Sequence, residues 1–586
     1  MFFVAFTKNS LKDRFKNNEY IVNELCLNPG YALFIVDSFF SEVKKNNHGF
    51  CITEGIHHDI EFEKDGILAS ISFDKKANTL LVNRATNSSR SIYYHSNSED
   101  GFFCSTHINM LRKAGVTISE NEKVIPEFFI YRHITPPNTM YKDVFQLSFN
   151  EDLEIKFDST GCSIKKQKKN DFIITDYDDG RIEKEHIEST YGILSEGIKG
   201  LIPIKEKVSV LLSGGLDSSI LFAFCQKILG LSNSFSTAYP FEDENSDLEK
   251  QYAISAANAF HSKHVVFETH CNDYLYGMVK SIKISEEPLH HLQSVMFYLM
   301  FKNCFIPEKE IIVSGQGADA IFGLSIHNSI YRFLKYKKFH NILNNPRLFP
   351  LVKVVPRIIK KGNGVIRSIN LGNRLSVTLD DPNHVVYSIH KYGDVDWVCD
   401  CFHVSKQDII INKYESIKQL KDYSIYDILA LSDLQGSLSI TNGIWSKLGE
   451  ANNKLLVFPF LTEKLMKNAF SVRWEKKLKS PKNILRGVAT KLQIPDFIIK
   501  RKKSGFAISP NKWALEDGVF EALVPLSYKY FDKHAIKRFQ KEKMSRAMTF
   551  WNILNYSIWK RLCIDNEPIE NLYDELSKHL HDNQNV

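Results

Sequence analysis

The chain has 586 residues, of which 43% are hydrophobic and 24% charged, and its formal net charge is +7. This length exceeds what one hydrophobic core supports, so two or three domains are expected. The basic residues are spread along the chain, which argues against nucleic acid as a partner. No run approaches the roughly 18 apolar residues of a membrane span, and the apolar run at residues 1–6 is too short for a signal peptide. With cysteines that show no disulfide spacing, these features predict a cytoplasmic enzyme without membrane contacts.

Residues 31–157 consist mostly of short alternating apolar runs broken by turns, for example at 32–36, 67–73, 79–82 and 91–94. This spacing predicts a β-rich antiparallel domain. A polar stretch at 165–179 is interpreted as the linker that follows it. Longer helical segments then alternate with strands such as 208–212 and 310–313, which is typical of a parallel sheet flanked by helices.

The sequence therefore predicts an α/β plus β-rich fold with domains at 1–170 and 180–586. Within the second domain, residues 331–373 are strongly basic. A solvated helical face is the favoured interpretation, and a docking surface for an acidic partner is the alternative. Cys399, Cys401 and His403 lie close together, but no second pair of ligands accompanies them, so reduced cysteines are favoured over a metal site.

The most informative stretch runs from Val208 to Ser219, where a β-branched apolar run ends in Ser213-Gly214-Gly215 and a helical segment follows. A buried strand, a glycine turn and a helix N-terminus together form an anion site from backbone N–H groups. Ser213 and Ser218 add hydroxyl donors, and Asp217 can hold Mg²⁺ against phosphate oxygens. The stretch is not a Walker loop, because no Gly-Lys-Ser/Thr follows.

Residues 213–218, Ser-Gly-Gly-Leu-Asp-Ser, resemble the pyrophosphate loop of the ATP pyrophosphatases, which cleave ATP between its α- and β-phosphates. Residues 311–323 resemble the Ser-Gly-Glu-Gly-x-Asp-Glu segment of asparagine synthetases, and residues 482–486 and 501–513 resemble that family's C-terminal signature. Residues 457–461 are similar to its Arg-x-Pro-Phe-Leu-Asp stretch, although Thr462 replaces the aspartate. The resemblance to the asparagine synthetase-like superfamily covers nearly the whole chain. It implies an N-terminal Ntn-hydrolase-like antiparallel sandwich and a C-terminal parallel-sheet ATP pyrophosphatase domain with helical elaborations.

Departures from the family pattern bear on function. Phe2 stands where a working glutamine amidotransferase exposes a nucleophilic cysteine, and the family's Arg-Asp-x-x-Gly stretch is absent near residues 83–87. The front domain is therefore expected to be a scaffold that makes no ammonia from glutamine. Gln316 replaces a glutamate thought to act as a base, and a primary amide cannot accept a proton at neutral pH. Glu287 or His290 could serve as the base instead, or their segment could be a polar loop that caps a helix.

The resemblance also implies site roles and a reaction. Lys503 would stabilise charge on the phosphates and on the second-step oxyanion, and Asp217 and Asp319 would bind Mg²⁺, with Ala320 replacing a neighbouring acidic residue. The residues expected to bind ATP are Leu211, Ser213, Gly214, Gly215, Leu216, Asp217, Ser218, Ser314 and Gly315.

The expected function is an ATP-dependent, AMP-forming amide ligase. The combination of a cysteine-less front domain and a changed base position resembles two branches of the superfamily, the lasso peptide cyclases and the β-lactam or carbapenam synthetases. The β-lactam formers place a tyrosine where Gln316 stands, so the resemblance favours the lasso peptide cyclases and implies a peptide carboxylate that closes on an amine of the same molecule. The resemblance to lasso peptide cyclases implies a leader-peptide-binding protein and a protease as partners. The alternatives are a β-lactam or carbapenam synthetase, an asparagine synthetase-like enzyme that uses free ammonia or another amine on a small-molecule carboxylate, and a catalytically inactive scaffold.

Overall fold

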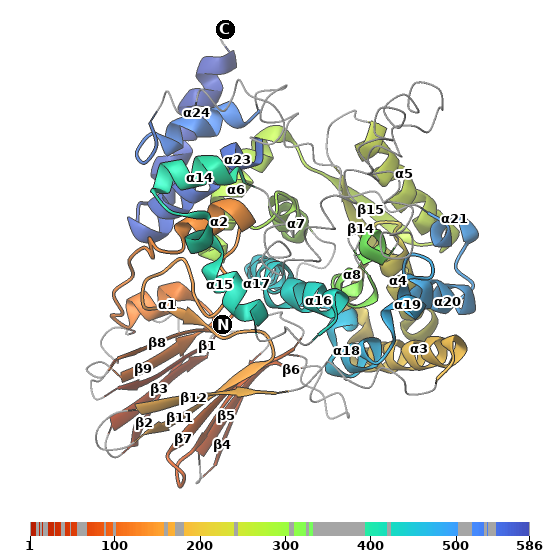
Figure 1. The fold of residues 1–586 in the computed structure, drawn as a ribbon, viewed down its shortest axis with the longest axis horizontal. Helices are drawn as coiled ribbons and strands as arrows, with labels where there is room; N and C mark the ends of the chain where they lie inside the picture. Colours follow the sequence, from red (N-terminus) through yellow and green to blue (C-terminus); the bar gives the residue numbers. More distant parts are fainter. Residues whose placement is uncertain are drawn as a thin grey trace, which may run out of the picture.

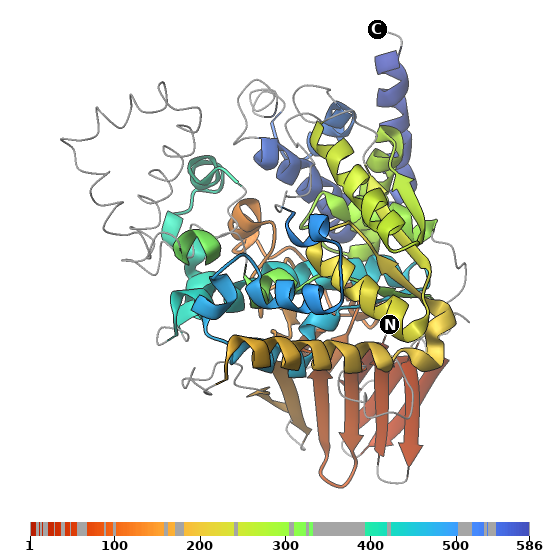
Figure 2. The same cartoon turned by 90° about the vertical axis from the view of Figure 1, so that its right-hand side faces the viewer.

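Two parts make up the fold, an antiparallel β-sandwich and a larger part built on a parallel sheet (Figure 1). In Figure 2 the strands of the sandwich lie at the bottom and the helical part lies above them. The computed structural model describes residues 2–7, 11, 15, 21–27, 30–36, 41–46, 49–55, 67–86, 90–97, 101–157, 162–169, 181–238, 244–303, 310–323, 327–331, 393–418, 423–501, 519–532, 536 and 547–584.

The sandwich is formed by two six-stranded antiparallel sheets. The first has the order β10-β8-β9-β1-β3-β2, and the second has the order β12-β11-β7-β6-β5-β4. Their bounds are β1 (Phe2–Thr7), β2 (Ile21–Leu27), β3 (Gly30–Val36), β4 (Ser41–Asn46), β5 (Gly49–Gly55), β6 (Ile67–Asp74), β7 (Thr79–Arg84), β8 (Tyr93–Asn97), β9 (Gly101–Ser105), β10 (Phe145–Gln146), β11 (Glu151–Phe157) and β12 (Cys162–Lys168).

Alternation along β1 shows how both faces of the first sheet are used. Val4 and Phe6 belong to the core that also contains residues of the second sheet, such as Ile71. Phe3 and Ala5 belong to the main core of the helical part. Successive side chains of a strand point to opposite faces, so one sheet closes the sandwich and also packs on the helices. The prediction of a β-rich antiparallel region at 31–157 is confirmed.

The interpretation of 165–179 as a linker is wrong at its beginning. Lys165, Lys166 and Lys168 belong to β12, which pairs antiparallel with β11 from Glu151↔Lys168 to Phe157↔Cys162. β12 is the outermost strand of its sheet, and lysines are the residues with which edge strands avoid pairing with further chains. Residues 170–179 lie outside the described part of the chain.

The second part contains a five-stranded parallel sheet of order β15-β14-β13-β16-β17. Its strands are β13 (Val208–Leu211), β14 (Asn233–Ala238), β15 (Lys263–Glu268), β16 (Glu310–Val313) and β17 (Lys454–Val457). The chain moves outward from β13 in one direction and returns to β16 on the other side. This reversal point, at the carboxyl ends of β13 and β16, is where open α/β sheets bind ligands.

Helices surround the parallel sheet and connect it to the sandwich. The α-helices are α1 (Ile108–Lys113), α2 (Ile125–Tyr131), α3 (Glu183–Lys199), α4 (Leu216–Leu229), α5 (Glu244–Ala259), α6 (Cys271–Ser285), α7 (Gln293–Lys302), α8 (Ala318–Phe322), α14 (Val395–Phe402), α15 (Lys406–Lys418), α16 (Ile425–Gln435), α17 (Ser437–Glu450), α18 (Glu463–Phe470), α19 (Trp474–Leu478), α20 (Asn483–Lys491), α21 (Asp496–Ile499), α23 (Ala547–Trp559) and α24 (Ile569–Gln584). The other helices are the 3₁₀ helices η2 (Ile202–Lys207), η3 (Pro459–Leu461) and η5 (Val519–Ser527) and the π-helix η6 (Lys560–Ile564).

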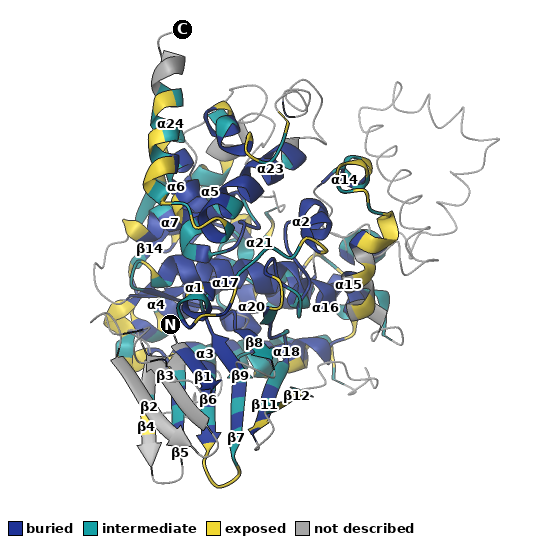
Figure 3. Cartoon of the chain, turned by 90° about the vertical axis from the view of Figure 1, so that its left-hand side faces the viewer, coloured by how far each residue is buried: buried dark blue, intermediate teal, exposed yellow. Residues whose placement is uncertain are grey.

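Helix α17 belongs to the helical part and packs against the sandwich, and it is buried over almost its whole length (Figure 3). Its Ser439 accepts a hydrogen bond from Arg84 of β7 at 2.6 Å, and its Lys447 donates to the Tyr93 hydroxyl of β8 at 3.0 Å. A side chain at Gly443 would meet Ser91 Oγ at 2.4 Å. These positions are four residues apart, so one face of α17 rests on the sandwich.

Several other sequence predictions concern this part of the chain. Residues 332–373, most of the basic stretch, lie outside the described residues. Cys399 and Cys401 have free thiols on α14, and the described residues contain no group of three or more His, Cys, Asp or Glu side chains that could hold a metal. Among the described helices, none has both the length and the apolar character needed to span a bilayer.

Candidate nucleotide-binding site

The turn between β13 and α4 is shaped by its own hydroxyl groups. Ser218 Oγ donates to the Gly215 carbonyl at 3.1 Å and lies 3.2 Å from Ser213 Oγ. Gly214 has a φ of +69°, and a Cβ there would lie 2.3 Å from the Tyr252 carbonyl oxygen. Only glycine fits such a position. The turn leads directly into the N-terminus of a fourteen-residue helix, where backbone N–H groups and the helix dipole favour anions.

A second turn follows β16 and leads into α8, which carries Asp319. β13 and β16 are paired in parallel, with Val210 opposite Val313. The two turns therefore leave the sheet side by side. A Cβ on Gly315 would lie 3.1 Å from the Ser218 backbone nitrogen, which shows how closely they approach. Strand pairing thus brings Asp217 and Asp319 to one place.

Lys482 joins the two carboxylates. Its ammonium forms ion pairs with Asp217 and, at 2.8 Å, with Asp319 Oδ1. Burial alone would lower the pKa of Lys482, but the negative charges of Asp217 and Asp319 outweigh it and raise the pKa above its ordinary value. Lys482 is therefore a fixed positive charge between two acids.

Lys482 was not assigned a role from the sequence, although it opens the segment 482–486 used for the family resemblance. It has a φ of +55° at the N-terminus of α20, an uncommon conformation for lysine. Lys503, which was assigned the charge-stabilising role, lies outside the described residues. Its predicted role stays a prediction.

The donor set here fits Mg²⁺. Asp217 Oδ1 is buried and has no hydrogen-bond partner among the described residues. Mg²⁺ is commonly held by one or two carboxylates, with water and substrate phosphates completing its shell. The magnesium assignment of Asp217 and Asp319 stays a prediction that this geometry suits.

Arg501 supports the turn between β13 and α4 from the side of α5. Its guanidinium pairs with Glu249, donates to the Ser213 carbonyl at 3.4 Å, and stacks 3.9 Å from the centre of the Tyr252 ring. Tyr252 is the same residue whose carbonyl contacts Gly214. Arg501 and α5 therefore fix the loop before any ligand binds, which is the arrangement that preorganised anion sites need.

A cavity of about 650 Å³ opens above these groups. Of the nine residues predicted to bind ATP, eight line it, and the exception is Gly214, which faces Tyr252. The full lining is Leu211, Leu212, Ser213, Gly215, Leu216, Asp217, Ser218, Phe235, Ser236, Thr237, Glu249, Ala253, Phe297, Met300, Ser314, Gly315, Gln316, Asp319, Gly323, Asn328, Ser329, Trp445, Pro481, Lys482, Arg486, Ile498, Lys500 and Arg501. Its volume lies within the ordinary range for small-molecule sites.

Glu287 and His290 are not among the residues that line this cavity. Glu287 accepts a hydrogen bond from the Tyr93 hydroxyl at 2.6 Å, and His290 Nδ1 lies 3.0 Å from Thr441 Oγ1 of α17. The adjacent Glu286 accepts from the backbone N–H groups of Ile108 and Asn109, at 2.7 and 3.0 Å, at the start of α1. These contacts suit a polar loop that caps a helix, the alternative raised from the sequence. The base role of Glu287 or His290 stays a prediction.

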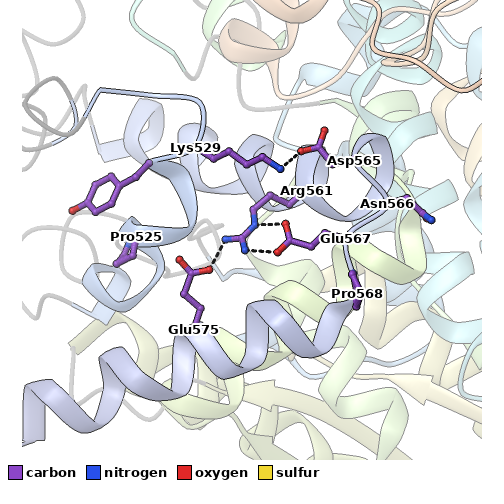
Figure 4. Close-up of a pocket in the computed structure, with 9 residues that line it drawn as sticks. Pro525, Lys529, Arg561, Asp565, Asn566, Glu567, Pro568 and Glu575 are labelled. Atoms are coloured by element: carbon purple, nitrogen blue, oxygen red, sulfur yellow. Dashed lines mark hydrogen bonds and ion pairs between the residues drawn. The ribbon is translucent and has the colours of Figure 1, made fainter.

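A second cavity, of about 700 Å³, lies among η5, η6 and α24 (Figure 4). Arg561 is paired there with both oxygens of Glu567, at 2.7 and 2.8 Å, and with Glu575 at 2.7 Å. Lys529 pairs with Asp565 on its rim. Both basic groups of this cavity, Lys529 and Arg561, are already paired, and its three acids outnumber them. No glycine is among its lining residues, and its net negative charge does not favour an anion such as a phosphate. Size alone therefore does not make it the functional site.

The glycine turn, the paired acids and the position at the reversal point of a parallel sheet define a class, the nucleotide-binding α/β proteins. Comparison with protein families narrows this class. The family model of asparagine synthase matches residues 203–375 and 395–561, more than half of the chain. The protein belongs to the asparagine synthase family, which confirms the superfamily predicted from the sequence motifs.

The chain is also similar to a protein of Methanocaldococcus jannaschii described as putative asparagine synthetase [glutamine-hydrolyzing] 2. The two are 23% identical over 325 residues, which is 55% of this chain and 60% of that relative. The match thus spans about three-fifths of the relative's length.

Proposed function

We propose that the protein is an ATP-dependent ligase that forms an amide and releases AMP and pyrophosphate. The observation that carries the proposal is the convergence of Asp217, Asp319 and Lys482 beside the glycine turn at the N-terminus of α4. Membership of the asparagine synthase family supports the same reaction class.

In the first step, a carboxylate oxygen of the substrate attacks the α-phosphorus of ATP. The bond from that phosphorus to the oxygen bridging the β-phosphate breaks, and pyrophosphate leaves with the electron pair. The turn at Ser213, Gly215 and Ser218 would receive the departing phosphates with backbone N–H and hydroxyl donors. Asp217 and Asp319 would hold Mg²⁺, which when bound neutralises charge on phosphate oxygens.

In the second step, an amine nitrogen attacks the activated carbonyl carbon. The bond from that carbon to the AMP oxygen breaks, AMP leaves with the electron pair, and the nitrogen loses one proton. Lys482 presents a positive charge that would stabilise phosphate oxygens in the first step and negative charge on the carbonyl oxygen in the second. Gln316 lines the cavity but cannot take the proton.

The favoured substrate is a peptide whose side-chain carboxylate closes on an amine of the same molecule, as in a lasso peptide cyclase. Two sequence features support this choice. β1 carries no cysteine that could release ammonia from glutamine, and Gln316 replaces the tyrosine expected of a β-lactam former. A substrate that contains its own amine needs no ammonia from glutamine, and the missing tyrosine disfavours a β-lactam former among the enzymes that use such substrates.

The test has two stages. ATP binding to the purified protein is measured by calorimetry with Mg²⁺, and then nucleotide products are separated after incubation with linear peptides, with a β-lactam precursor carboxylate, and with aspartate plus ammonia. The proposal expects AMP and pyrophosphate with the peptides. ADP as the product would overturn the mechanism. Turnover only with aspartate and ammonia would favour an asparagine synthetase-like enzyme. Failure to bind ATP would indicate an inactive scaffold.

A further inference from the structure

The wall of the cavity that α7 and α17 form is apolar and aromatic. Phe297 and Met300 come from α7, one helical turn apart, and Trp445 comes from α17. The rings of Phe297 and Trp445 have centroids 4.2 Å apart, so the two helices present one continuous surface. In Figure 1, α7 and α17 lie at the centre of the molecule, whereas α4, α20 and α21 lie to the right.

The charged residues that line the cavity come from the other elements. They are Asp217, Glu249, Asp319, Lys482, Arg486, Lys500 and Arg501. Most already have partners. Lys482 pairs with both aspartates and Arg501 with Glu249. Arg486 donates to the Pro481 carbonyl at 2.7 Å, and Lys500 pairs with Asp496.

No charged residue of α7 or α17 lines the cavity in the described part of the chain. A free amino acid would carry an α-ammonium and an α-carboxylate close to its reacting group. Against this wall each charge would lose water without gaining a partner, which is strongly unfavourable. An uncharged, apolar group would bury its surface there at a gain of about 25 cal/mol per Å².

The wall is also held in place. Trp445 Nε1 donates to Ser294 Oγ at 3.0 Å, one turn of α17 after the contact of Thr441 with His290. The single polar atom of the indole is therefore satisfied behind the wall, and its ring is fixed toward the cavity. A preorganised apolar surface binds a matching group with little loss of conformational entropy.

A different part of the cavity lies next to the turn between β13 and α4, where Leu211, Phe235, Thr237 and Ala253 line it from β13, β14 and α5. A nucleoside whose phosphates reach that turn would lie against these residues. This would leave the wall of α7 and α17 for the second substrate.

We infer that Phe297, Met300 and Trp445 form the specificity pocket for the carboxylate substrate, and that this pocket takes a large apolar or aromatic group flanking the carboxylate. The substrate class is therefore a peptide-like acid that is uncharged around its reacting group, as opposed to a free amino acid. This inference rests on the proposed ligase function.

The experiment uses three probes on the whole protein. They are N-acetyl-phenylalanyl-aspartic acid α-amide, its glycyl counterpart and free aspartate. Binding of each is measured by calorimetry in the presence of AMP and pyrophosphate. In a separate assay, hydroxylamine traps the activated acyl group as a hydroxamate. We expect the phenylalanyl probe to bind at least about 10-fold more tightly than the glycyl probe, the range that hydrophobic pockets achieve.

Met300→Gln keeps the side chain's length and adds polarity, so it should reduce this preference. Tyr298→Phe, on the same helix and outside the lining, serves as the control and should retain it. Equal binding of the two peptides, or tighter binding of aspartate, would overturn the pocket inference and leave the ligase proposal standing. If Met300→Gln lowered the affinity for ATP as much as the affinity for the phenylalanyl probe, the wall would hold the adenine. That result would also overturn the pocket inference. Selective probe binding without hydroxamate from any probe would instead count against the ligase.

Discussion

Charged groups lie beyond the carboxyl ends of β13 and β16 and at the amino ends of β16 and β17, and the two ends of the parallel sheet differ in their surroundings. At the carboxyl ends, the side chains of Asp217, Asp319 and Lys482 are 21%, 30% and 10% exposed, and all three line the cavity. At the amino ends, Glu310 and Lys454 form a 2.9 Å pair whose side chains are 0% and 2% exposed, and Ser209 donates to Glu310.

The difference in exposure separates two roles that ion pairs have in this sheet. The pair at the amino ends joins two adjacent strands in register and cannot reach a ligand, so it can act only on stability. The group at the carboxyl ends can exchange its internal partners for phosphate and Mg²⁺. Ion pairing alone does not mark a candidate functional site, whereas ion pairing at the edge where open parallel sheets bind ligands does.

The largest expected effect is at the carboxyl ends. Asp217→Ala and Asp319→Ala should each abolish AMP formation, because each removes a predicted Mg²⁺ ligand and leaves Lys482 with one partner. AMP release and thermal unfolding are measured together. Asp396→Ala, whose side chain is 80% exposed, is the control and should behave as wild type. Near wild-type turnover in either cavity variant would remove that residue from the ligand set.

The second prediction concerns the amino ends. Glu310→Ala or Lys454→Met should lower the free energy of unfolding by about 3–5 kcal/mol, because each leaves one buried charge uncompensated. The double change to methionine at both positions should recover most of that loss. Denaturant unfolding measures the effect, and the folded fraction should keep its AMP-forming activity. A specific loss of activity without loss of stability would contradict the division between the two ends.

The third prediction tests Lys482. Lys482→Met should lower AMP formation by about 10²–10³-fold, the usual effect of removing one preorganised electrostatic group. Because the folded pKa of Lys482 is raised, its charge is complete at every pH below the ordinary lysine pKa and is lost only in more alkaline solution. The first step should therefore show no inflection near neutral pH that belongs to Lys482. A titration of the adenylation rate there that vanishes in Lys482→Met would show that the ammonium is not fixed.

The fourth prediction concerns the proton released in amide formation. If an α-amine supplies its own neutral fraction, the rate of the second step should rise through about pH 7–8. Glu287→Gln and His290→Ala should then leave that profile unchanged. A drop of about 10²–10⁴-fold in product, with adenylation intact, would assign the base role to the altered residue. Equal losses in both steps would show a structural role. Gln316→Glu, which places a negative charge near the phosphates, should not increase the rate.

The smallest expected effect is that of glutamine. β1 carries no cysteine that could attack glutamine. Arg84 lies where the family's Arg-Asp-x-x-Gly stretch is expected, and its guanidinium already donates to the carbonyls of Arg90 and Leu147 and to Ser439, at 2.6, 2.7 and 2.6 Å. Adding glutamine should neither release glutamate nor change product formation. Glutamate release by purified protein, measured by coupled assay, would contradict this.

The sequence predicted the features that depend on neighbouring residues. The β13 strand, its glycine turn and the following helix were recognisable because they are continuous in the chain, and strand pairing then explains why Asp217 meets Asp319. Lys482 was missed because its contact with Asp217 joins residues 265 positions apart. The polar composition of β12 obscures the pattern of an edge strand, and for this reason its last residues, 165–168, are predicted as part of a linker. The apolar wall depends on how α7 and α17 pack, which no local pattern reveals.

The four-residue spacing along α17 has a consequence for the front domain. One face of this helix rests on Arg84, Ser91 and Tyr93 of the sandwich, while Trp445, two residues beyond Gly443, points away toward α7 and the cavity. The sandwich therefore supports the helix that forms one wall of the cavity. Expressing the helical part alone would expose this face of α17 and remove the contacts of Ser439 and Lys447 that align the helix, while Trp445 would keep its contacts with Ser294 and Phe297.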